Sequence, residues 1–417
     1  MSQFASLHIE LYHNICSYIN DIGTLEALLQ TCRYFHSCTK SIPALYVQHV
    51  SMQQLTRFSS LRELAVSDSS NFTKRHMLCI FSQMNGVKYL KLMNLNIISC
   101  QHDHNHNMFH LGTINSEQSK LTYLELDTVI CSGIVLMNFC TIFSNTLKTV
   151  TLNAYFQLTD EHVKVLLENL GALESIKMSN IFSLLSLTLI AVKSDVLKTI
   201  NFEKCPNLSE FSFQAAKKMP SVTSINFSYT NISTSTLHRM VDYFPKVSKI
   251  ECRRCVKFVD GIEISSPSVT EIDFQLCNNV KSVSLNCPLL KHLLLTQCYS
   301  ITELKLKSTA IDALDLSMLN LLRSLDIKCP NLKDINFSGC SRLKVNPNFH
   351  NFDLLESLHL ECPLDMITTR RKVGGSGLFN QVDMIKTAEF HDDSVQNQPV
   401  YYDAKLLRKD MRRSASL

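Results

Sequence analysis

From Val269 the chain reads VTEIDFQLCNNVKSVSLNCPL, from Leu290 LKHLLLTQCYSITELKLKSTA, and from Ile311 IDALDLSMLNLLRSLDIKCPN. Val269, Leu290, Ile311 and Leu332 therefore recur with a period of 21 residues, and a fixed period of this length is typical of a solenoid. Each unit opens with an L-x-x-L-x-L pattern in which apolar and polar residues alternate, as a strand with one buried face requires. Because one unit cannot bury that face alone, we expect the units to stack.

The same pattern extends backwards through most of the chain, with starts 21 to 34 residues apart. Its predicted strands are Leu61–Val66, Val87–Leu92, Leu121–Leu126, Leu147–Leu152, Leu173–Met178, Leu197–Phe202, Val222–Phe227 and Val247–Cys252. The longer repeats have room for a helix, and Thr159–Leu170 has the right pattern for one, with Thr159 as its cap and Gly171 at its end. This alternation predicts a parallel sheet with helices behind it.

The 21-residue repeats leave no room for a helix. Their second halves, Val280–Leu285, Ile301–Leu306 and Leu322–Ile327, repeat the strand pattern of the first halves. We therefore expect a second short strand on the back of each of these repeats.

The repeats resemble leucine-rich repeats. This resemblance implies an α/β fold in which residues 46–362 form a curved solenoid with a parallel sheet on its concave side, helix-backed in the early repeats and strand-backed in the late ones. Residues 363–417 lack apolar periodicity and are expected to form a flexible tail with a short helix near Tyr401–Met411.

Composition limits the function. The chain has 417 residues, a net charge of +4 and 19% charged residues, which gives no case for nucleic acid binding. The first residues lack the pattern of a signal peptide, and the most apolar run, 181–192, is shorter than a membrane span. We expect a soluble protein of the cytoplasm or nucleus, without contact to membranes.

Sixteen cysteines invite a disulfide or metal interpretation, but their positions favour core packing. Five of them occupy the small inward-facing position just after a strand: Cys205, Cys255, Cys277, Cys298 and Cys340. Cys252 and Cys255 form a C-x-x-C pair without a second pair at zinc spacing, and His102, His104, His106 and His110 fall in a spacer between strands. We expect no disulfide, no bound metal and no cofactor.

The first 45 residues have a sequence pattern that differs from the repeats. Leu7–Ile19 reads L-x-x-E-L-x-x-x-I-x-x-Y-I and Leu25–Phe35 reads L-x-x-L-L-x-x-C-R-x-F. This pattern is similar to the F-box, and an F-box followed by leucine-rich repeats resembles the family of substrate receptors in cullin-RING ubiquitin ligases. The resemblance implies a helical module over residues 5–45 that binds the Skp adaptor, and through it cullin, with Leu7, Glu10, Leu11, Ile15, Leu25, Leu28, Leu29 and Cys32.

Two functions remain open. No residues form a pattern for catalysis, so we expect a non-enzymatic protein that recognises an unknown protein substrate on its concave face. Candidate contact residues there are Tyr89, Tyr123, Lys249, Arg253 and Leu294. The charge along the face is mixed and does not predict a substrate of one sign. The alternative is a ligase-independent interaction scaffold, whose N-terminal module is only a cap over the first repeat.

Overall fold

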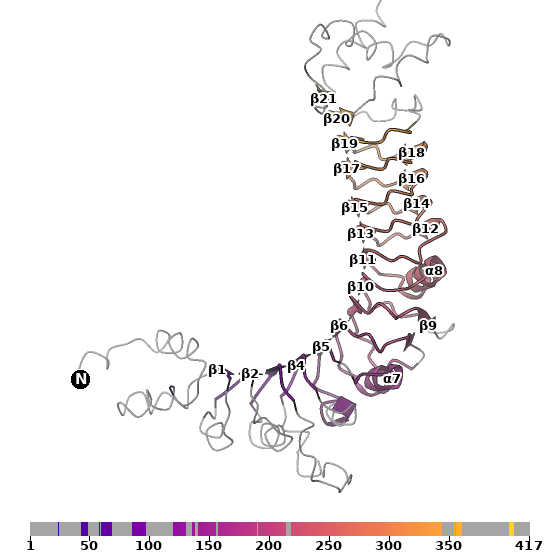
Figure 1. The fold of residues 1–417 in the computed structure, drawn as a ribbon. Coiled ribbons are helices and arrows are strands. Elements are labelled where there is room, and N and C mark those ends of the chain that lie inside the picture. The colour runs from indigo at the N-terminus through magenta and orange to yellow at the C-terminus, as the bar shows by residue number, and fades with distance from the viewer. Residues whose placement is uncertain are drawn as a thin grey trace, which may run out of the picture. The chain divides into compact units, whose positions relative to one another are not determined.

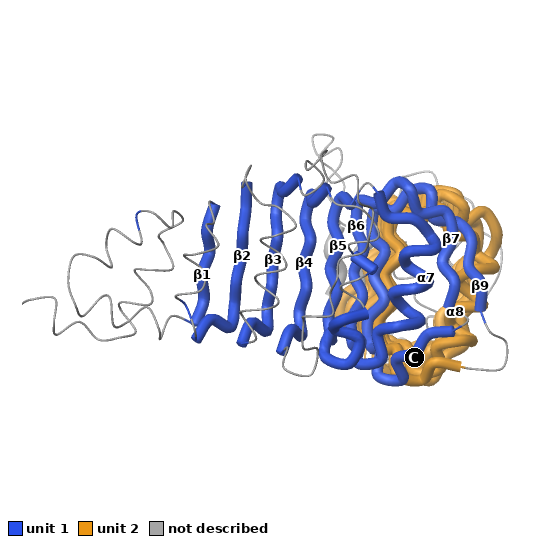
Figure 2. Tube along the Cα trace, turned by 90° about the horizontal axis from the view of Figure 1, so that it is seen from below, with its two compact units in different colours: residues 1–216 blue, residues 217–417 orange. Residues whose placement is uncertain are grey.

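A computed structural model of the chain describes residues 24, 43–48, 58, 60–68, 86–96, 120–130, 136–137, 141–155, 157–189, 191–213, 218–343, 354, 356–360 and 400–403. The chain divides into two compact units, residues 1–216 and 217–417 (Figure 2). The predicted Skp-binding residues, the histidine-rich spacer and most of the predicted tail lie outside the described residues.

Unit 1 (residues 1–216) has one strand per repeat in its main parallel sheet. These strands lie side by side in chain order (Figures 1 and 2): β1 (Ala44–Val47), β2 (Glu63–Ser67), β3 (Tyr89–Met93), β4 (Tyr123–Asp127), β5 (Thr149–Asn153), β6 (Ser175–Ser179) and β8 (Thr199–Asn201). Leu90 and Leu92 are fully buried, while Tyr89 and Lys91, which alternate with them, face outward. The predicted solenoid, with its alternating strand pattern, is confirmed.

Unit 2 (residues 217–417) continues the repeat in two groups of main-sheet strands (Figure 1). The first group is β10 (Ser224–Asn226), β11 (Lys249–Glu251), β13 (Glu271–Asp273) and β15 (His292–Leu294); the second is β17 (Ala313–Asp315), β19 (Asp334–Asn336), β20 (Ser357–Leu360) and β21 (Val400–Asp403). All pair in parallel except β21, which pairs antiparallel with β20. Residues 400–403 thus form a strand, where a helix within the flexible tail was expected.

The main sheet of unit 2 is interrupted between β15 and β17, which belong to different sheets among the described residues. A second sheet bridges this level. It consists of β12 (Ile262–Ser265), β14 (Ser282–Asn286), β16 (Glu303–Lys307) and β18 (Ser324–Lys328), all parallel. These strands confirm the prediction that the 21-residue repeats are backed by strands.

In the longer repeats, the segment behind the main-sheet strand is a helix in some repeats and a short strand in others, although the repeat lengths are similar. Helix α7 (Asp160–Asn169) follows Thr159, the predicted cap, whose backbone N–H donates to His162 Nδ1 (3.1 Å). Helix α8 (Thr234–Tyr243) is capped by Ser233, which accepts from the N–H of Thr236 (3.2 Å). Between them lie two short paired strands, β7 (Ser186–Thr188) and β9 (Glu210–Ser212). Repeat length alone therefore does not select a helix.

In each of the two sheets behind the main sheet, a helix side chain accepts hydrogen bonds from backbone N–H groups at the first strand. In unit 1, the carboxylate of Asp160 on α7 accepts from the N–H groups of Leu185 (2.9 Å) and Ser186 (3.0 Å). In unit 2, His238 Nε2 on α8 accepts from the N–H of Glu263 on β12 (3.0 Å). Each edge therefore has polar partners from the neighbouring helix, which limits its pairing with another chain.

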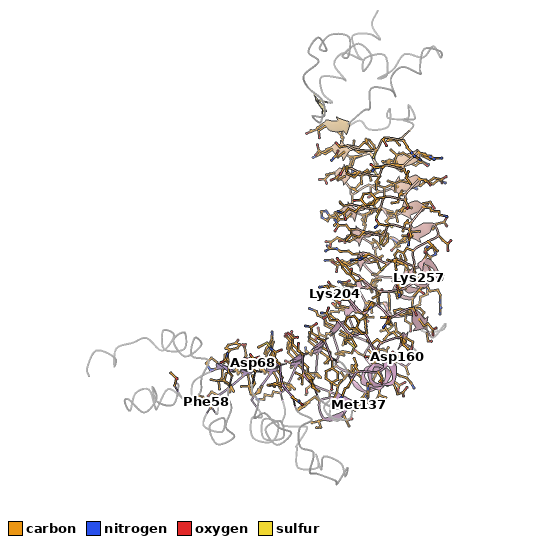
Figure 3. The ribbon with its side chains drawn as sticks, viewed as in Figure 1. Phe58, Asp68, Met137, Asp160, Lys204 and Lys257 are labelled. Carbon is orange, nitrogen blue, oxygen red and sulfur yellow. The ribbon has the colours of Figure 1, made fainter. Side chains whose placement is uncertain are left out.

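Twelve of the main-sheet strands (β2 to β6, β8, β10, β11, β13, β15, β17 and β19) are followed, within three residues, by a residue with a positive φ, the left-handed region that favours glycine. The set in unit 1 begins at Asp68 and ends at Lys204 (both labelled in Figure 3): Asp68, Asn94, Thr128, Ala154, Asn180 and Lys204. In unit 2 it is Tyr229, Arg254, Leu276, Gln297, Met318 and Gly339. The N–H groups of nine of these residues donate to a carbonyl of the next repeat, as Ala154 does to Ser179 (2.9 Å). The inter-repeat bonds offset the backbone strain.

Ala154→Gly should stabilise unit 1 by about 0.5 to 1 kcal/mol. The φ of Ala154 is 50°, where a Cβ costs about 1 to 2 kcal/mol, and the entropy of glycine in the unfolded chain offsets part of the gain. Urea denaturation measures the change. The control, Ala313→Gly on the exposed face of β17, should instead lose about 0.5 to 1 kcal/mol. Equal losses at both positions would contradict the assignment of strain to Ala154.

Candidate functional site

The predicted recognition residues fall on the outer face of the main-sheet strands or directly beside it. Tyr89 on β3 and Tyr123 on β4 stand opposite each other in register in unit 1. Lys249 on β11, Arg253 just after β11, and Leu294 on β15 belong to unit 2. The structure thus brings the two tyrosines together and groups the other three residues separately.

Tyr89, Tyr123, Glu125 and Lys91 form one connected group, here called the tyrosine cluster. The two rings stack with centroids 4.2 Å apart and planes 15° from parallel. Their hydroxyls both donate to Glu125 Oε2, at 3.1 Å from Tyr89 and 3.0 Å from Tyr123. Lys91 Nζ binds the other carboxylate oxygen at 2.8 Å. Each side chain in the group is thus held by at least one other.

The register of β3 and β4 creates this group. Tyr89 pairs with Tyr123, and Lys91 pairs with Glu125, two residues further along both strands. Residues two apart on a strand share a face, and directly opposite residues on neighbouring strands lie within contact distance. Lys91 and Glu125 were not among the predicted contact residues. The signal that could have found them is their equal position in successive L-x-x-L-x-L patterns.

The tyrosine cluster fixes the charge on Glu125. Partial burial acts to raise the pKa of Glu125, but bonds from Lys91, Tyr123 and Tyr89 together hold it below the usual value of 4.5. Because the folded-state pKa is the lower one, Glu125 adds stability above pH 4.5, and this contribution is lost as the pH falls through the folded-state pKa. Burial first, and then Glu125, raises the pKa of Tyr89. A carboxylate surrounded by neutral phenols is therefore the state at neutral pH.

Tyr46 repeats this contact at the start of unit 1. Its hydroxyl donates to Glu63 Oε2 on the neighbouring strand (3.2 Å), and burial, followed by the charge of Glu63, raises its pKa. Its side chain is about 40% exposed. The face of β1 to β4 thus presents three tyrosines whose hydroxyls donate to neighbouring acids, Tyr46 exposed and the stacked Tyr89 and Tyr123 half-buried.

The candidate residues of unit 2 are held mainly by ion pairs. Lys249 Nζ lies 3.3 Å from Glu251 and 3.7 Å from Glu271. Arg253 Nε donates to Asp273 Oδ2 at 2.6 Å. Leu294 pairs in register with Asp273 and is 40% exposed. The apolar side chain of Leu294 thus lies on a polar face, next to the Asp273 carboxylate that is ion-paired with Arg253.

The cysteines form a buried column behind the strands. The thiols of Cys277, Cys298 and Cys340 each donate to a backbone carbonyl of an earlier repeat at 3.0 Å. Burial raises the pKa of Cys298 to about 12 and that of Cys340 to about 11, so these thiols are protonated and weakly reactive. Cys252 and Cys255 are both buried and are not joined by a disulfide.

The described residues contain no group of three or more His, Cys, Asp or Glu side chains arranged to hold a metal. Within the same ranges, no helix has the length and apolarity to cross a bilayer. The geometry of the strand face, with its charges paired and its aromatic rings fixed, suits binding of another molecule.

No protein-family model matches the chain, and no curated protein matches it. Among solved structures, it is similar to the leucine-rich repeat domain of the type III effector XopL, at 18% identity over 46% of this chain and 72% of that chain, with a TM-score of 0.32. It is also similar to a chain of the yeast Rad7 and Elc1 complex (13% identity, 79% and 89% covered, TM-score 0.33). A third likeness is to the functional domain of InlJ from Listeria monocytogenes (14% identity, 78% and 68% covered, TM-score 0.30).

Proposed function

We propose that the chain is the substrate-recognition adaptor of an SCF-type ubiquitin ligase. The observation that carries the recognition half of this proposal is the tyrosine cluster, an aromatic pair fixed in advance on the strand face. Fixed aromatic side chains are frequent anchors of protein interfaces, since little conformational entropy is lost when they bind. The ligase half rests on the resemblance of residues 5–45 to the F-box.

The proposed mechanism is proximity. The N-terminal module binds the Skp adaptor and thereby cullin, while the strand face holds the target protein. Holding the target beside the charged conjugating enzyme raises its effective concentration. No side chain of this chain needs to take part in the chemistry.

The second candidate function is a ligase-independent interaction scaffold. It shares the strand face and differs only at the N-terminus, where residues 5–45 would cap the first repeat. Purification of the full-length chain from cells separates the two. Skp and cullin should co-purify with the wild-type chain and should be lost from Leu25→Asp with Leu28→Asp, because charges on an apolar interface are costly. A wild-type chain that brings down neither protein would favour the scaffold.

Tyr89→Ala combined with Tyr123→Ala should weaken target capture by about 1 to 3 kcal/mol, the range for loss of a central anchor. The measurement is binding of a target found by proximity labelling. Tyr89→Phe with Tyr123→Phe is the matched control, because it keeps both rings and should retain most of the affinity. Unchanged binding by the alanine variant would mean that the target docks elsewhere.

A further inference from the structure

A row of mainly basic residues borders the strand face of unit 1. It is formed by the residues directly before β2, β3, β4, β5, β6 and β8, and we call it the basic row: Arg62, Lys88, Thr122, Lys148, Glu174 and Lys198. Backbone bonds fix their order, since the carbonyl of each accepts from the N–H of the next, as Arg62 does from Lys88 (2.7 Å) and Lys148 from Glu174 (2.7 Å). Four of the six positions are cationic and one is acidic.

Glu174 shows how a carboxylate is held in this row. Lys148 and Lys198, its neighbours on either side, reach its two oxygens at 2.8 Å each. These two bonds lower the pKa of Glu174 to about 2. A carboxylate in the row is thus bound by the cations on both flanking strands.

Arg62 and Lys88 stand next to each other without such a carboxylate. Both are exposed, and among the described residues neither forms an ion pair. Glu63, the acid that follows Arg62 in the chain, accepts from Tyr46 instead (3.2 Å). Like charges on neighbouring strands repel each other. Among the described residues, this pair of cations therefore has no carboxylate partner, whereas three strands further along Glu174 supplies one.

We infer that the partner of unit 1 is an acidic, extended peptide segment that lies along the basic row and places a carboxylate between Arg62 and Lys88. The inference deepens the proposed function, on which it rests, by naming the class of substrate. It goes beyond the sequence expectation, which considered the mixed charge of the whole face, because this row alone carries four cations and one acid.

The dimensions agree with a short segment. Neighbouring strands lie about 4.8 Å apart, so the five steps from Arg62 to Lys198 span roughly 24 Å, the length of about seven extended residues. Lys88 and Thr122 directly precede Tyr89 and Tyr123. A bound segment therefore passes beside the tyrosine cluster, where an apolar residue of the partner can contact the half-buried rings.

Binding of fluorescein-labelled decaglutamate to the full-length chain, followed by fluorescence anisotropy, tests the inference. Decaglutamate should bind and decaglutamine should not, and the affinity should fall as salt is raised. Arg62→Ala with Lys88→Ala should weaken binding about tenfold, the amount that two exposed ion pairs supply. Glu174→Gln should strengthen it about threefold, because Lys148 and Lys198 become available.

The matched control is Lys305→Ala with Lys307→Ala on β16, which removes the same charge from the second sheet of unit 2. If this control lost as much affinity for decaglutamate as Arg62→Ala with Lys88→Ala, the binding would depend on net charge alone, and the inference would be wrong. Tighter binding of decathymidylate through Arg62 and Lys88 would reassign the row to nucleic acid. The assay contains neither Skp nor cullin. A negative result would therefore not bear on the ligase proposal, which the co-purification experiment tests.

Discussion

Phe274→Ala should lower the free energy of unfolding by about 3 to 5 kcal/mol, the usual cost of removing a buried ring. The side chain of Phe274 is 1% exposed, and its ring meets that of Phe258 edge to face, with centroids 6.0 Å apart and planes at 87°. The two rings belong to successive repeats, so the cavity would open at the contact on which stacking depends. Urea denaturation followed by circular dichroism measures the loss.

Phe182→Ala is the matched control. Phe182 is 60% exposed, and its truncation should change stability by no more than about 0.5 kcal/mol. If the two variants lose the same stability, the buried contact between Phe258 and Phe274 does not hold these repeats together.

Cys277→Asp should cost several kcal/mol and prevent cooperative folding of unit 2. Cys277 is fully buried, and its thiol donates to the carbonyl of Cys252 at 3.0 Å. Aspartate would have to bury a charge without a counter-ion or fold in its protonated form. Burial already raises the pKa of the Cys277 thiol well above its usual value, which shows how strongly the site disfavours a negative charge.

Cys277→Ser separates charge from polarity at the same position. Serine keeps the donor and nearly the same volume, so we expect a cooperative melt at a slightly lower temperature. Thermal denaturation of both variants by circular dichroism makes the comparison. An aspartate variant that melts within a few degrees of wild type would mean that water reaches the cysteine column.

The main-sheet strands could be predicted from the sequence because their signal is local. The pattern predicted a strand at Val87–Leu92, and β3 is Tyr89–Met93. The second strands of the 21-residue repeats were predictable for the same reason. The helix after Thr159 carried both a cap and an apolar stripe, so it too could be found.

The side-chain contacts between repeats could not be predicted, although equal positions in successive repeats indicate which residues lie opposite each other. The carboxylate of Glu125 is shared by Tyr89, Tyr123 and Lys91, two of which come from another repeat. The residues of positive φ escape prediction because side chains as different as Thr128 and Leu276 occupy them, the conformation being held by backbone bonds to the next repeat. The ion pairs around Glu174 likewise join residues more than twenty positions apart.

The interruption between β15 and β17 has a mechanical consequence. A stack of strands resists bending through the hydrogen bonds that tie each strand to the next. At this level those bonds come from β16 and β18 of the second sheet, while the described main-sheet strands contribute none. Rotation about the β16–β18 ladder therefore breaks no bond between described main-sheet strands at this level. Leu294 lies on β15 beside this interruption, so a bend here would change its surroundings.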